Sequence, residues 1–192
     1  MFNSVIRKGN VSLFYSDTGR VLNSKNVKTL IKNLSIALGQ VDKIQKGKIT
    51  KSIKINKKIE LSLTMCGNAK IKSLNKQYRN KNNITDVLSF PMFESLRNNS
   101  TKSMISLLET VSLGDIVISK DVAYKQSRKF GISYEQEVIH LFVHGLLHLL
   151  GFDHELSIKE ERIMEDLEQN IVKNIYKDLE LQGIVERYGR ND

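Results

Sequence analysis

The chain of 192 residues has little of several features that would define its class. It contains one cysteine, one proline and no tryptophan, and no run approaches the roughly 18 consecutive apolar residues of a membrane span. The single cysteine, Cys66, has no partner within the chain, which excludes a disulfide scaffold. Residues 1–10 lack the apolar stretch of a secretory signal. We therefore expect a cytoplasmic protein.

What is present is typical of one globular domain. The length is about that of an average domain, and 40% hydrophobic with 27% charged residues is an ordinary soluble composition. No repeat or long linker divides the chain. We expect one domain over residues 1–192, with about residues 177–192 as a C-terminal tail.

Charge is unevenly distributed along the chain. The net charge is +9, with +10 on residues 1–60, +6 on residues 61–131 and −7 on residues 132–192. The excess of basic residues before residue 132 would attract a polyanion such as nucleic acid. A lysine-rich proteome would produce the same composition without such a role. The lysine run from Lys43 to Lys58 indicates a solvated loop or hairpin more than a dedicated RNA contact.

Apolar periodicity predicts both strands and helices. Alternation or short apolar runs predict strands at residues 11–15, 59–65, 87–90 and 116–118. Helical spacing predicts helices at residues 27–38, 68–79, 120–130 and 133–150, and a last helix from 157 through 171. Residues 92–114 are expected to be mainly polar loop. The mixture, with a helical C-terminal half, predicts an α+β fold.

All four histidines of the chain fall between residues 140 and 154. His144 and His148 are four residues apart on a helix that begins with a capping box, so their imidazoles share one face. Gly151 permits the positive φ that ends the helix, and His154 can then supply a third nitrogen. Three imidazoles leave a coordination position for water, as in catalytic zinc sites. We predict one zinc ion per chain, bound by His144, His148 and His154.

Two neighbouring residues lie outside the predicted ligand set. His140 lies one turn before His144, about 6 Å further along the helix axis, and is left out of the ligand set. It is a fourth ligand, a partner of a ligand or a surface residue. Asp153 is a candidate to accept a hydrogen bond from a ligand imidazole, or equally an exposed turn residue.

The ligand spacing also matches the metzincin proteases, which predicts a zincin-like metal helix in the C-terminal half. Those enzymes have a glutamate directly after the first histidine as general base, and this chain has Gly145 there. A metallopeptidase-like hydrolase is therefore a minor alternative.

Three stretches carry recognisable motifs. His144–His154 reads H-G-L-L-H-L-L-G-F-D-H. Asn68–Arg79 ends in N-K-Q-Y-R and is followed by T-D-V-L-S-F-P at Thr85–Pro91, and Gly114–Ile118 reads G-D-I-V-I. Over about residues 60–170 the chain resembles the YbeY family of bacterial ribosomal RNA maturation factors.

The resemblance implies a small mixed β-sheet flanked by helices, with the zinc at the end of a groove. It implies a single-strand-specific, metal-dependent endoribonuclease that acts in 3′-end processing of small-subunit (16S) rRNA and in ribosome quality control. Expected partners are single-stranded RNA, small-subunit rRNA and ribosomal proteins, with no membrane and no DNA. Arg79 is expected to bind the scissile phosphate, because a guanidinium can donate two parallel hydrogen bonds to it. The alternative is a ribosome-assembly factor that binds rRNA and whose zinc site is largely structural.

Overall fold

The computed structural model describes residues 2–18, 24–47, 55–97 and 99–181. Its strands are β1 (Phe2–Lys8), β2 (Val11–Asp17), β3 (Lys58–Cys66), β4 (Val87–Pro91) and β5 (Thr110–Ser119). Its helices are α1 (Ser24–Gln45), α2 (Asn68–Arg79), α3 (Asn99–Ser106), α4 (Lys120–Phe130), α5 (Tyr134–Leu149) and α6 (Ile158–Leu181). The predicted α+β class is confirmed.

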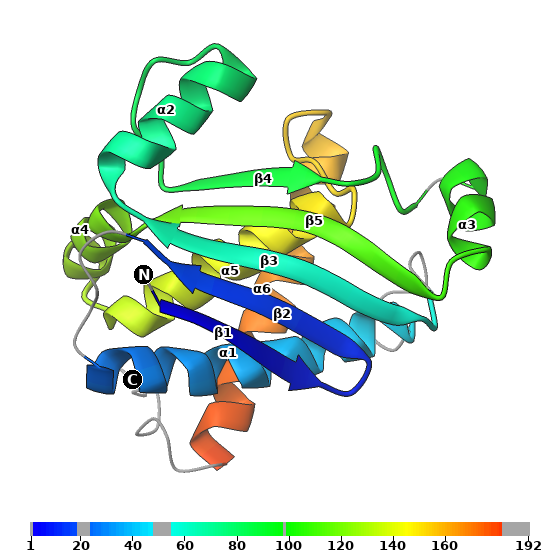
Figure 1. Cartoon of the computed structure of the whole chain (residues 1–192), viewed down its shortest axis with the longest axis horizontal. Coiled ribbons are helices and arrows are strands. Elements are labelled where there is room, and N and C mark those ends of the chain that lie inside the picture. The colour runs from blue at the N-terminus through cyan, green and yellow to red at the C-terminus, as the bar shows by residue number, and fades with distance from the viewer. Residues whose placement is uncertain (1, 19–23, 48–54, 98, 182–192) are drawn as a thin grey trace.

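The strands form one mixed sheet in the order β1-β2-β3-β5-β4 (Figure 1). The central pairs β2–β3 and β3–β5 are parallel, and the outer pairs β1–β2 and β4–β5 are antiparallel. Parallel strands require crossover connections, which α1 supplies between β2 and β3. The short strand β4 is left at one edge of the sheet, and this edge adjoins the functional site.

The sheet has a large core on one face and a small one on the other. On β3, Ile59, Leu61, Leu63 and Met65 alternate with partly exposed polar residues and are almost fully buried in the main core with α1, α5 and α6. On the opposite face α2 covers a second cluster, which contains Cys66, Ile71, Leu88 and Val117. Burial raises the pKa of the Cys66 thiol to about 11, so this cysteine acts as a packing residue.

The N-terminal half and the central loop contain elements that the sequence patterns do not predict. A strand precedes residues 11–15: β1 pairs with β2 through a turn in which Gly9 has a φ of 57°. Only Ile6 of β1 is buried, so this edge strand lacks the alternation that would predict it. The loop predicted at 92–114 contains α3 and the first half of β5. Helix α3 has two buried residues, Thr101 and Ile105, and the alternation of Val111 and Leu113 in β5 is too short to produce a clear periodic signal.

Helix α1 passes through Gly39, where the sequence predicts its end. Val41 and Ile44 continue the apolar stripe and are each 1% exposed, which outweighs the cost of about 1 kcal/mol for an interior glycine. The start of the lysine run is therefore helical, and Lys43 lies 3.7 Å from Asp178. Residues 48–54 of the run lie outside the described residues.

The last helix, α6, begins after Ser157, whose hydroxyl accepts a hydrogen bond from the Glu160 amide. It continues to Leu181, so residues 177–181 of the expected tail are helical. Residues 182–192 lie outside the described part of the chain. Within that part, we find no helix with the length and apolar character needed to cross a membrane.

Candidate metal centre and the adjoining cleft

Helix α5 and the turn after it carry the histidines. The Ser133 hydroxyl and the Gln136 side chain form the predicted capping box, which fixes where the helix begins. Gly151 follows the helix with a φ of 86°. A Cβ at this position would lie 2.5 Å from the Ser95 hydroxyl, so conformation and close packing both require glycine. The turn then brings His154 back to His144 and His148.

The three histidines form a compact triad. One ligand-capable atom from each of His144, His148 and His154 lies within 4.8 Å of the others. The Nε2 atoms of His144 and His148 are 3.2 Å apart. Two nitrogens bound tetrahedrally to one zinc ion at about 2.0–2.1 Å would be separated by about 3.3 Å, so this spacing fits a shared metal ion. The triad could therefore hold a metal ion.

The protonation state of His148 also suits a metal. Burial, with smaller contributions from His144 and His154, lowers the pKa of His148 to about 4. His148 is consequently neutral at pH 7, and the neutral imidazole is the form that binds metals. The Nδ1 atom of His154 is buried and has no hydrogen-bond partner among the described residues.

Glu168 on α6 contacts the triad and was not predicted. Its Oε2 atom lies 3.1 Å from Nδ1 of His144. An ionised carboxylate can only accept a hydrogen bond, so this contact favours the tautomer with the proton on Nδ1, which leaves the Nε2 lone pair for a metal ion. Glu168 follows the buried Met164 by four residues, in line with the buried face of the helix. An acidic residue in an apolar stripe is a signal that could have been detected in the sequence.

We expect Glu168→Gln to lower metal affinity by about 10- to 100-fold, the usual effect of removing a partner of a ligand histidine. Competition with a chromogenic chelator measures this. The control is Glu165→Gln, which removes the same charge from an exposed position on the same helix. Equal affinities in the two variants would show that the hydrogen bond to His144 does not orient the ligand.

The other two residues near the triad have different surroundings. His140 packs against Tyr176 with ring centroids 5.9 Å apart, and its buried Nε2 has no partner among the described residues. It is not part of the triad. The Asp153 carboxylate accepts a hydrogen bond from the Glu155 amide at 2.9 Å. Among the described residues, the carboxylate that contacts an imidazole nitrogen of the triad is that of Glu168. The role of Asp153 stays a prediction.

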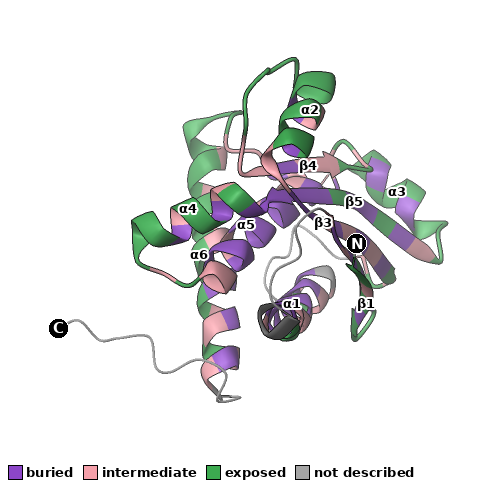
Figure 2. Cartoon of the chain, turned by 60° about the vertical axis from the view of Figure 1, so that its left-hand side comes forward, coloured by how far each residue is buried: buried purple, intermediate pink, exposed green. Residues whose placement is uncertain are grey.

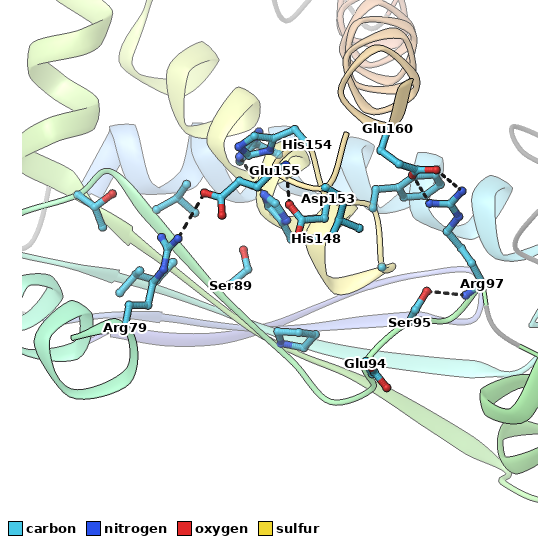
Figure 3. Close-up of a pocket in the computed structure, with 18 of the residues that line it drawn as sticks. Arg79, Ser89, Glu94, Ser95, Arg97, His148, Asp153, His154, Glu155 and Glu160 are labelled. Atoms are coloured by element: carbon cyan, nitrogen blue, oxygen red, sulfur yellow. Dashed lines mark hydrogen bonds and ion pairs between the residues drawn. The ribbon is translucent and has the colours of Figure 1, made fainter. Parts of the chain in front are cut away.

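An open cleft of about 1090 Å³ lies beside the triad, and all three histidines line it. Arg79, at the C-terminal end of α2, lines the same cleft from the opposite side. Its Nη2 atom lies 3.7 Å from Glu155, the residue after His154 (Figure 3). Both side chains are largely exposed, so the pair contributes little stability and a stronger anion can displace Glu155.

A second arginine holds the turn that carries His154. Both Nη atoms of Arg97 donate to the Glu160 carboxylate, and its guanidinium lies 4.8 Å from the centre of the Phe152 ring (Figure 3). Phe152 is 2% exposed and two residues before His154. Arg97 thus contacts Phe152 before His154 and Glu160 after it, and so holds the turn on both sides of that histidine. No local pattern predicts a pairing between residues 63 positions apart.

Gly145 has a structural explanation. A Cβ there would lie 3.0 Å from both Ile116 on β5 and Ser89 on β4, because α5 packs closely on the sheet at this point. The position of the metzincin general base is thus buried against the sheet, with no room for a glutamate. This packing argues against the metallopeptidase alternative.

These features define an α+β protein with a histidine triad, on a helix and the turn after it, that could hold a metal ion beside a cleft to which Arg79 and Arg97 contribute. The sequence profile of a family described as "Endoribonuclease YbeY" matches residues 24–176. The chain belongs to the YbeY family.

Individual relatives agree with this assignment. Endoribonuclease YbeY of Caldicellulosiruptor bescii is 38% identical over 138 residues, covering 70% of this chain and 87% of the relative. The Persephonella marina protein of the same name is 43% identical over 117 residues, covering 61% and 71%. A solution structure from Thermotoga maritima has a similar fold, with a TM-score of 0.52 and 21% identity over 93% of this chain and 99% of that one.

Proposed function

We propose that the chain is an endoribonuclease specific for single-stranded RNA, with one zinc ion bound by His144, His148 and His154. We further propose that it acts in the cytoplasm on small-subunit rRNA, in 3′-end maturation and ribosome quality control, together with ribosomal proteins. The observation that carries the proposal is the placement of the triad and Arg79 on opposite sides of one open cleft.

The metal site and Arg79 are expected to make different contributions to the chemistry in this cleft. A zinc ion, when bound, supplies a Lewis acid beside the phosphate. The Arg79 guanidinium offers two donors to the phosphate oxygens and stabilises negative charge that develops on them. Phosphate binding would displace Glu155 from Arg79. Glu168 contacts Nδ1 of His144 and would favour the tautomer whose Nε2 could bind the ion.

The alternative, an assembly factor with a structural zinc, requires a closed metal site. Structural zinc sites have four protein ligands, whereas three-ligand sites keep a position for water or substrate. Among the described residues, the group that could bind a metal has three members, and they border the cleft. The open arrangement favours catalysis.

The decisive experiment compares cleavage with binding in the same variant. Purified His148→Ala protein should bind single-stranded RNA with nearly wild-type affinity and lose cleavage of it. Binding is followed by fluorescence anisotropy, cleavage by gel analysis of end-labelled RNA, and folding by circular dichroism. Equal residual cleavage by the folded variant and the wild type would exclude the proposed enzyme and favour the assembly factor.

A further inference from the structure

A strongly basic segment adjoins the cleft. Residues 67–85, which contain α2 and the turn after it, carry five basic and no acidic side chains. The helix packs on the sheet through Ile71 and Leu74, and most of its other residues are exposed (Figure 2). Such a surface gains free energy by releasing counterions when it meets a polyanion. The segment therefore suits the backbone of a nucleic acid strand.

An aromatic side chain lies within this basic surface. Tyr78, the residue before Arg79, is 61% exposed. Its ring rests edge-to-face against Phe90 on β4, with the centroids 5.1 Å apart and the planes at 66°. Tyr78 is thus supported by a second ring and still offers most of its surface to solvent.

The rings of Tyr78 and Phe90 lie beside β4, the edge strand that borders the cleft. Phe90 packs on the side of β4 that α2 covers, with Leu88. Its neighbours Ser89 and Pro91 line the cleft, as do Val87 and Leu88. Because β4 is the last strand of the sheet, a strand of RNA in the cleft can pass over this edge to reach Tyr78. Arg79 and Tyr78 are adjacent on α2 with side chains about 100° apart around the helix, so Arg79 reaches the cleft while Tyr78 contacts Phe90 at its edge.

We propose that Tyr78, supported by Phe90, is a stacking platform for an unpaired nucleobase of the RNA whose phosphate Arg79 binds; this rests on the proposed function. Aromatic rings stack on any base, which gives binding without sequence selection. The bases of a duplex are already paired and stacked. The platform therefore contributes to the preference for single strands.

The absence of tryptophan provides a direct test. Tyr78→Trp introduces a single fluorophore at the platform, and a stacked adenine should quench it. The probe is a short single-stranded oligoadenylate, mixed by stopped flow so that the signal is read before cleavage. The matched control is Tyr124→Trp on α4, where the parent tyrosine is 58% exposed and is not among the residues lining the cleft.

We expect quenching in Tyr78→Trp and none in Tyr124→Trp, and little quenching when the oligonucleotide is annealed to its complement. By anisotropy, Tyr78→Ala should bind the oligoadenylate roughly tenfold more weakly, whereas Tyr78→Phe should bind like the wild type.

Unquenched Tyr78→Trp together with wild-type affinity in Tyr78→Ala would overturn the platform and leave the proposed function standing. Equal quenching by the duplex would also overturn it. Failure of the wild-type protein to bind the oligonucleotide would overturn both proposals.

Discussion

His154→Ala protein should be purified with little bound metal, in contrast to about one zinc ion per chain in the wild type. The physical reason is that the variant keeps only two of the three nitrogens that lie within 4.8 Å of one another. Two ligands on one helix face cannot close a tetrahedral site. Elemental analysis after dialysis against metal-free buffer measures the loss.

His140→Ala is the matched control, because it removes a histidine that lies on α5 but outside the triad. The His140 ring contacts Tyr176, so this variant is expected to be somewhat less stable but to retain its metal. Full metal occupancy in His154→Ala, or equal loss in both variants, would show that the three histidines are not the ligand set.

Arg79→Lys should bind RNA nearly as well as the wild type and cleave it about 10²–10³-fold more slowly. Lysine keeps the positive charge, which preserves electrostatic attraction, but it loses the planar pair of donors. Removing one contact that strengthens in the transition state has this size of effect in other enzymes. Single-turnover cleavage rates, with binding followed by anisotropy, separate the two contributions.

The control is Arg128→Lys, the same substitution in the last turn of α4. Like Arg79, Arg128 is an exposed arginine near the end of a helix, but it is not among the residues lining the cleft. Its cleavage rate should not change, and neither variant should lose metal. A normal rate in Arg79→Lys would make Arg79 an ordinary helix-end residue, and loss of metal or of folding would give it a structural role.

Local patterns in the sequence predict those elements whose buried residues are regularly spaced. The alternation at residues 59–65 predicts β3 to within a residue at each end, and the capping box predicts the start of α5. β1 was missed because only Ile6 is buried, although Gly9 followed by Asn10 is a turn signal between it and β2. Where few side chains are buried, periodicity carries no information.

The sequence by itself determined the histidine triad. His144 and His148 are placed by the helical repeat, and Gly151, just after the helix, permits the positive φ that turns the chain back. The approach of His154 follows from these two facts. All of this information lies within eleven consecutive residues, where backbone geometry alone limits the distances between side chains.

Only the tertiary structure decided which groups surround the triad. Glu168 reaches His144 because α6 packs against α5, and Arg97 secures the turn because the loop before α3 meets the start of α6. The sequence suggested Arg79 only through a family resemblance, and its place in the cleft depends on α2 lying over the edge of the sheet. Such contacts join distant segments, and they arise from the sum of many weak packing interactions that no short pattern contains.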